Sequence, residues 1–271
     1  MKNTARLKFL FALVFSLSLT ADAVAHEYWL EPETFFPARG EKTVVRLFVG
    51  DGLTKDREER PFQLAKTERF EIFSLNQSLN LKPLIADEAL PIYNFSANRA
   101  GNYLLSMERN WSYIKLEPQK FEDYLREDGM EYISAERAKL GETAKEARER
   151  YSRFIKSLLQ VGDKRDETYK KPIGLKLEIT PLENPYSKRV GDKLKFQVTF
   201  DGKPLANRTI FAENRNSEKQ RMKTDRNGKI TVKLDQNGLW LVRMVTMRRC
   251  AADCGEADWE SFWSAFSFGV K

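Results

Sequence analysis

The chain has 271 residues, of which 41% are hydrophobic and 31% charged, and its formal net charge is +7. This length fits one large or two modest domains with a packed core. The mild basicity is spread along the chain without a basic helix, an aromatic platform or a nucleic-acid motif, so we expect no nucleic-acid partner.

The first 25 residues have the three parts of a secretory signal peptide. Basic residues precede an apolar run over 10–19, and the small residues Ala23 and Ala25 form a cleavage site. The run is shorter than the roughly 20 residues that a transmembrane helix needs, and no later segment reaches that length. We therefore expect export to a bacterial periplasm, cleavage before His26, and a mature form without a transmembrane segment. An uncleaved membrane anchor is the alternative.

Segment 26–116 is expected to form an antiparallel β-sandwich. Residues 43–49 are rich in β-branched and aromatic side chains and end at a Gly-Asp-Gly turn. Residues 69–75 alternate between apolar and polar, and residues 101–108, which begin with a glycine, are another expected strand. Prolines punctuate the whole segment, which is typical of short strands joined by turns.

Segment 117–162 is expected to be a helical insertion. Residues 119–127 and 134–161 are dense in Ala, Glu, Lys, Arg and Leu, and the glycines at 129 and 141 divide the stretch into two or three helices. Apolar residues with helical spacing mark one face: Tyr151, Phe154, Ile155, Leu158 and Leu159. We expect this face to pack on the protein's own β-structure, and a partner-binding helix is the alternative.

Residues 163–172 are a charged linker, and β-signals return in segment 173–271. Strands are expected over 175–179, 193–200, 229–234, 239–247 and 262–270, with turn signals about every ten residues. The predicted fold class is therefore mainly β: two immunoglobulin-like or transthyretin-like antiparallel β-sandwiches with an α-helical insertion between them.

Cys250 and Cys254 are the only cysteines. In an oxidising compartment a local disulfide is the expected state. The bond closes a very short loop, so its entropic contribution to stability is expected to be small. A metal-binding thiolate pair and two unpaired thiols are the alternatives.

His26 is the only histidine and the candidate metal ligand. Cleavage before His26 frees its α-amino group, which can then chelate one metal ion together with the imidazole Nδ1. Both nitrogens lose their protons easily near neutral pH. Such ligands suit Cu(II), Ni(II) and Co(II), with Cu(II) bound most strongly. In the uncleaved precursor the nitrogen is an amide and the site does not exist.

The other ligands of such a site are not defined by the sequence. A second histidine is absent, so they must come from Glu27, Glu31, other carboxylates, Met244, Met247 or the cysteine pair. The alternative is that His26 merely follows a cleavage site and binds nothing.

Enzymatic activity is not expected, and we name no catalytic or cofactor-binding residue. The chain has no G-x-S-x-G, HExxH or phosphate-loop motif, and a Ser-His-Asp site would have to use His26 at a chain terminus. Aromatic residues suggest a platform for sugars, although burial in strands is the commoner fate of such side chains. These residues are Tyr28, Trp29, Trp111, Trp240, Trp259 and Trp263.

Several segments resemble the DUF4198 family. They include AHEYWLEP, PARGEKTVVRLFVGDG, YSRFIKSLLQVGD, KPIGLKLEITPLENPY, GDKLKFQVTFDGKPLANRTIFA, TDRNGKITVKLDQNGLWLVRMVTM and ADWESFWSAFSF. The resemblance covers almost the whole mature chain. It implies an exported protein of a kind often described as the periplasmic component of cobalt or nickel uptake systems. The turns at 202–205 and 225–228 also resemble transthyretin-like repeats, which usually act as spacers or adhesive modules.

We therefore expect a periplasmic, non-enzymatic binding protein that binds Ni, Co or Cu ions or delivers them to a membrane transporter of an uptake system. The competing hypothesis is a structural or adhesive β-sandwich module of the cell envelope that binds a partner or a glycan without metal.

Overall fold

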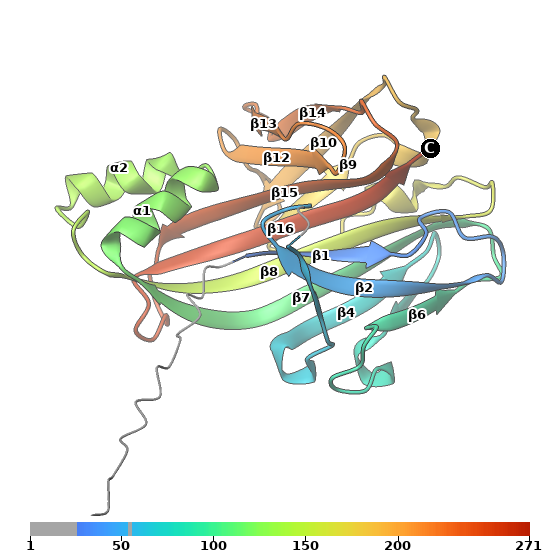
Figure 1. Ribbon diagram of the computed structural model, residues 1–271, viewed down its shortest axis with the longest axis horizontal. Helices are drawn as coiled ribbons and strands as arrows, with labels where there is room; N and C mark the ends of the chain where they lie inside the picture. The colour runs from blue at the N-terminus through green and yellow to red at the C-terminus, as the bar shows by residue number, and fades with distance from the viewer. Residues whose placement is uncertain (1–25, 54–55) are drawn as a thin grey trace, which may run out of the picture.

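A computed structural model describes residues 26–53 and 56–271 (Figure 1). The expected signal peptide, residues 1–25, lies outside the described residues. The described chain forms three β-sheets and two α-helices, together with short 3-10 helices over Leu64–Lys66, Lys82–Leu84, Glu167–Lys170 and Pro185–Ser187.

The central sheet has eight strands in the order β13-β12-β15-β16-β8-β7-β4-β5. Their bounds are β13 (Gln220–Lys223), β12 (Thr209–Asn214), β15 (Gly238–Arg249), β16 (Trp259–Val270), β8 (Ala147–Val161), β7 (Gly101–Leu116), β4 (Thr67–Phe73) and β5 (Ser78–Asn80). Neighbouring strands are antiparallel except β16 and β8, which run parallel in the middle of the sheet.

Two smaller sheets cover opposite faces of the central sheet. The second sheet contains β1 (Glu27–Pro32), β2 (Lys42–Gly50), β3 (Glu58–Arg60) and β6 (Tyr93–Ser96), and the third contains β9 (Leu177–Pro181), β10 (Lys193–Phe200), β11 (Lys203–Pro204) and β14 (Lys229–Lys233). Successive side chains of β16 point to opposite faces of the central sheet. Phe262 and Phe266 pack toward the third sheet, whereas Ala265 packs toward the second. All twelve residues of β16 are therefore buried.

The helices α1 (Pro118–Glu127) and α2 (Glu131–Lys139) share one face of the central sheet with the second sheet. Phe121 and Leu125 of α1 and Ile133 of α2 pack with Trp259 and Trp263 of β16. In Figure 1 the helices lie over one end of the long strands β7, β8, β15 and β16, and β1 and β2 lie further along them.

The prediction of helix over residues 134–161 is wrong beyond α2. Residues 147–161 form β8, a strand that pairs with β7 on one side and β16 on the other. From residue 152 onward β8 is buried on both faces, so its apolar residues need not alternate, and several of them fall at helical spacing. Helix formation is confirmed only over α1 and α2.

The mainly β composition with several antiparallel sheets is confirmed, but two separate sandwiches are not. The central sheet takes β4, β5 and β7 from segment 26–116, β12, β13, β15 and β16 from segment 173–271, and β8 from segment 117–162. The segment expected to be an insertion therefore supplies the strand that joins the two halves.

Candidate ligand-binding cleft

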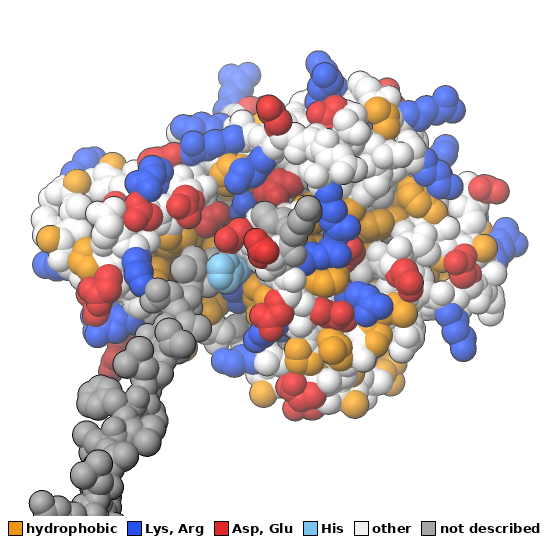
Figure 2. Space-filling view, viewed as in Figure 1, with side chains coloured by type: hydrophobic (Ala, Val, Ile, Leu, Met, Phe, Trp, Pro, Cys, Tyr) orange, Lys and Arg blue, Asp and Glu red, His pale blue; other side chains and the backbone are white. Residues whose placement is uncertain are grey.

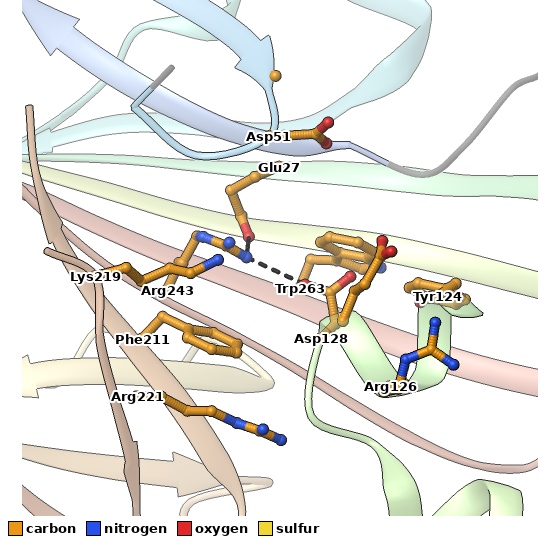
Figure 3. Close-up of a pocket in the computed structure, with 12 residues that line it drawn as sticks. Glu27, Asp51, Tyr124, Arg126, Asp128, Phe211, Lys219, Arg221, Arg243 and Trp263 are labelled. Carbon is orange, nitrogen blue, oxygen red and sulfur yellow. Dashed lines mark hydrogen bonds and ion pairs between the residues drawn. The ribbon is translucent and has the colours of Figure 1, made fainter. Parts of the chain in front are cut away.

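A cleft of about 450 Å³ opens between the helices and the second sheet, with the central sheet as its floor (Figure 3). Its lining residues come from the start of β1, the end of β2, α1, β12, β13, β15 and β16, together with the connecting residues Asp51, Asp128 and Lys219. The long strands extend beneath both covering elements, so the space between those elements leaves part of the floor accessible.

His26 immediately precedes β1 and contacts Asp51 at the edge of this cleft. Its Nδ1 is 2.7 Å from Oδ1 of Asp51, whose residue lines the cleft just after β2. The His26 carbonyl oxygen accepts a hydrogen bond of 3.0 Å from Nη2 of Arg153 on β8. The His26 side chain is 40% exposed and that of Asp51 is 77% exposed, so both are open to solvent. Figure 2 shows the single histidine at the surface of this hollow.

A row of residues in register on the central sheet supports the start of β1. Arg109 of β7 pairs with Arg153 of β8, which pairs with Trp263 of β16. The Tyr28 ring contacts the guanidinium groups of both Arg109 and Arg153, at 5.0 and 4.2 Å from its centroid. The backbone and the first side chains of β1 are thus fixed above the sheet, which orients His26.

The inner part of the cleft is built around Arg243 of β15 (Figure 3). Its guanidinium lies 2.7 Å from Glu213, 3.1 Å from Asp128 and 3.6 Å from Glu27. Burial raises the pKa of Glu27 to about 8 and also raises the pKa of Asp128, in both cases against the attraction of Arg243. Burial opposes the charge on Arg243, but Glu213, Glu27 and Asp128 together raise its pKa.

Glu27 keeps one oxygen without a hydrogen bond. Its Oε2 is buried and accepts no hydrogen bond from any described residue, although Nη1 of Arg243 lies 3.6 Å away. A buried carboxylate oxygen without a donor is costly, so this atom is a candidate contact for a ligand.

A second buried carboxyl group, Glu149 of β8, lies beneath α1. Its Oε1 accepts hydrogen bonds from the hydroxyl groups of Tyr124 and Ser261. Burial raises the pKa of Glu149 to about 7, and these two hydrogen bonds oppose the rise. Tyr124 in turn stacks on Trp263 with ring centroids 5.9 Å apart, so Glu149 supports one wall of the cleft.

The structure does not bring Glu31, Met244 or Met247 to His26. Glu31 is engaged by Trp29, Arg57 and Arg215, at 3.0, 2.6 and 2.8 Å. Met244 is buried in the core beneath the third sheet, and Met247 is buried beneath the helices. Of the carboxylates named individually, only Glu27 lies in the same cleft as Asp51.

Cys250 and Cys254 lie at disulfide distance in the connection between β15 and β16, with Cα atoms 6.2 Å apart. Within residues 26–53 and 56–271, Cys250, Cys254 and Glu260 are the one group of three potential metal-binding residues whose ligand atoms lie close together. His26 is not part of this group. The Glu260 carboxylate is held by Arg150 and Arg248, each at 2.5 Å. Two guanidinium partners leave this carboxylate poorly suited to a metal ion.

Removing the disulfide is expected to change stability little. The double variant Cys250→Ser/Cys254→Ser should lower the free energy of unfolding by at most about 2 kcal/mol, because the bond closes a loop of sequence separation 4. Urea unfolding of the oxidised protein and of the double variant measures the difference. A loss above about 4 kcal/mol would show that the cysteines support more than their own loop.

The structure does not form the aromatic platform considered for sugars. Trp29, Trp240, Trp259 and Trp263 are at most 1% exposed. Trp111 is partly buried beneath the guanidinium of Arg150, 4.4 Å from its ring centroid.

Sequence reasoning missed the charged residues of the cleft, although a signal existed. Arg243 interrupts an apolar run that forms the buried strand β15. A charged residue inside such a run is buried unless the strand is exposed, and it then requires a partner. The sequence does not reveal that the partners of Arg243 are Glu27, Asp128 and Glu213, because three separate segments contribute them.

Within the described residues no helix is long and apolar enough to span a membrane. No curated protein matches the chain. Among solved structures, a structure of the three N-terminal domains of the bacteriophage RB49 highly immunogenic outer capsid protein is similar, at 12% identity and a TM-score of 0.17. The alignment covers 89% of this chain and 59% of the capsid-protein chain, so it spans less than two thirds of the capsid-protein chain. At this TM-score the similarity supports no inference about fold or function.

A family model described as a domain of unknown function, DUF4198, matches residues 23–248. The match includes the start of β1, the α1 end of the cleft and almost all of β15. The chain therefore belongs to the DUF4198 family.

Proposed function

We propose that this protein is an exported, non-enzymatic binding protein that takes a transition-metal ion as cargo at the N-terminus of its mature form. The observation that carries the proposal is the fixed position of His26. Its carbonyl is bound by Arg153 and its imidazole faces the Asp51 carboxylate at the mouth of the cleft. A ligand held in this way loses less conformational freedom on binding a metal than one on a free terminus.

The donor atoms suit the proposed cargo. After cleavage before His26, the α-amino nitrogen and Nδ1 chelate one ion, and Asp51 adds a carboxylate oxygen. Two ligands bound at about 2.0–2.1 Å and at right angles lie about 2.9 Å apart, and Nδ1 and Oδ1 are already 2.7 Å apart. Two nitrogens and one oxygen favour Cu(II) over Ni(II) and Co(II) in intrinsic affinity. The exposure of both side chains leaves positions for water or for a ligand from a receiving transporter.

Calorimetric titration of the mature protein, beginning at His26, with Cu(II), Ni(II) and Co(II) tests the proposal. We expect one ion to bind per chain. His26→Ala and acetylation of the N-terminus should each weaken binding by about a hundredfold or more, because each removes one arm of the chelate, and Asp51→Asn by about tenfold. The matched control is Asp163→Asn, which alters an exposed aspartate after β8 and should leave binding unchanged.

Tight binding that survives both His26→Ala and acetylation would refute the His26 site. If no metal binds while the mature protein is retained on cell-wall material, the structural or adhesive module without metal becomes the better hypothesis. Delivery to a membrane uptake system requires in addition that the loaded protein transfers its ion to that transporter, which a transfer assay with both purified components measures.

A further inference from the structure

We propose that the inner part of the cleft binds the ammonium group of a small organic amine, with Glu27 and Asp128 as its acceptors and the rings of Phe211 and Trp263 beside its apolar part. This site is distinct from the metal site at His26 and does not depend on it. The proposal rests on the charge balance of the inner cleft, one buried carboxylate oxygen without a donor, and the aromatic wall (Figure 3).

The inner cleft has more negative than positive charge in its ionised form. Glu27, Asp128 and Glu213 surround the single guanidinium of Arg243. Lys219 adds one positive charge at the rim. The net formal charge is about −1 when Glu27 is ionised. Because burial raises the pKa of Glu27 to about 8, this carboxyl group is mostly protonated at neutral pH, and an ammonium ligand binds as that proton is released.

The two other basic residues of the lining have carboxylate partners outside it. Arg126 pairs with Asp123 at 2.5 Å, and Arg221 pairs with Glu131. Neither is therefore needed to neutralise the inner carboxylates, and a cationic ligand is favoured over an anionic one.

Glu27 provides the specific contact. Its side chain is 2% exposed, it lines the cleft, and Oε2 accepts no hydrogen bond from the part of the chain that is described. An ammonium group carries three donors and no acceptor. It can donate to Glu27 Oε2 and to Asp128 at the same time and supplies the donor that Oε2 lacks.

The aromatic wall already contacts cations. The Phe211 ring centroid lies 4.9 Å from the guanidinium carbon of Arg243 and 5.0 Å from Nζ of Lys219. Trp263 and the stacked Tyr124 complete the wall. Aromatic faces attract cations and accept apolar groups, and about 450 Å³ is within the usual size of small-molecule sites.

Three probes with the same skeleton test the ligand class: 2-phenylethylamine, 2-phenylethanol and 3-phenylpropionate. Each is titrated calorimetrically into the mature protein with EDTA present, so that metal binding makes no contribution. We expect the amine to bind with a dissociation constant below about 1 mM, and the alcohol and the carboxylate at least about tenfold more weakly. No binding of the amine at about 10 mM, or equal binding of the three probes, would overturn the proposal.

Variants locate the site. Glu27→Gln and Asp128→Asn keep the side-chain shape and should each weaken amine binding by about tenfold or more. Asp163→Asn is the matched control, because Asp163 is an exposed aspartate after β8 and lies outside the cleft lining. Thermal melting of each variant separates loss of binding from loss of fold, and Asp128→Asn remains decisive if Glu27→Gln does not fold. Unchanged amine binding in Asp128→Asn would refute the site.

The two proposals fail separately. His26→Ala should leave amine binding in EDTA unchanged while it removes metal binding. Amine binding that disappears in His26→Ala but persists in Asp128→Asn would place the amine at the mouth of the cleft and contradict the inner site.

Discussion

Glu178→Gln is expected to lower the free energy of unfolding by about 3–5 kcal/mol, because it leaves the buried ammonium group of Lys156 without its counter-charge. The side chains of Lys156 and Glu178 are 1% and 4% exposed, and Nζ lies 2.9 Å from Oε1. Nζ also donates to Thr180, and Glu178 accepts from the backbone nitrogens of residues 173 and 174. Urea unfolding of the wild type and the variant gives the difference.

An exposed ion pair supplies the control for this prediction. Lys188 and Glu183 are 2.8 Å apart, close to the 2.9 Å of the buried pair, but the Glu183 side chain is 44% exposed. Glu183→Gln should therefore cost less than about 1 kcal/mol. The double variant Lys156→Met/Glu178→Leu removes both buried charges and should cost less than Glu178→Gln alone. Equal costs for Glu178→Gln and Glu183→Gln would show that the buried pair has no special role.

The buried ion pair of Lys156 and Glu178 also affects the geometry of the cleft. Lys156 lies on the face of β8 that packs against the third sheet, and Arg153, three positions earlier, lies on the opposite face beneath His26. Glu178 is on β9 of the third sheet. A buried polar pair of this kind can fix the register of a strand, and the register of β8 determines where Arg153 meets the start of β1.

The sequence predicted most of the strands, including β15 and β16, which are buried on both faces, but it failed at β8. The expected ranges 193–200 and 43–49 agree with β10 and β2. In β8 the residues from 152 onward are all buried, so no alternation remains to distinguish a strand from a helix. The pairing of β8 with β7 and β16 decides the outcome, and those strands begin 46 residues before and 112 residues after the start of β8.

The site was predictable only in part, for a related reason. His26 was identified by its chemistry, whereas Asp51 was seen only as part of a turn. The antiparallel pairing of β1 with β2, in which Glu27 lies opposite Gly50, brings His26 and Asp51 together. The approach of Asp128 to Arg243 depends on α1 packing beside β15 and β16, which no local pattern encodes.

The stability of the protein is expected to fall as the pH rises from about 4.5 to about 7, and Glu149 is one cause. Its pKa is about 7 in the folded protein, against 4.5 for the free group. Between these values the folded state holds a proton that the unfolded state has released, so the stabilisation present at low pH is lost as the pH rises. The shift corresponds to about 3 kcal/mol for this group.

Glu149→Gln tests this assignment, because the amide keeps the shape and an acceptor oxygen for Tyr124 and Ser261 but does not titrate. The free energy of unfolding is measured with urea at several pH values from 4 to 9. Between pH 4.5 and 7 the value for the variant should rise by about 3 kcal/mol relative to the wild type. Glu27 titrates in the same direction at a higher pH, about 8, in both proteins and therefore cancels in the difference. Glu146→Gln alters an exposed side chain paired with Lys115 and should show no comparable gain. Parallel pH profiles for Glu149→Gln and the wild type would show that this carboxyl group is not the one that titrates.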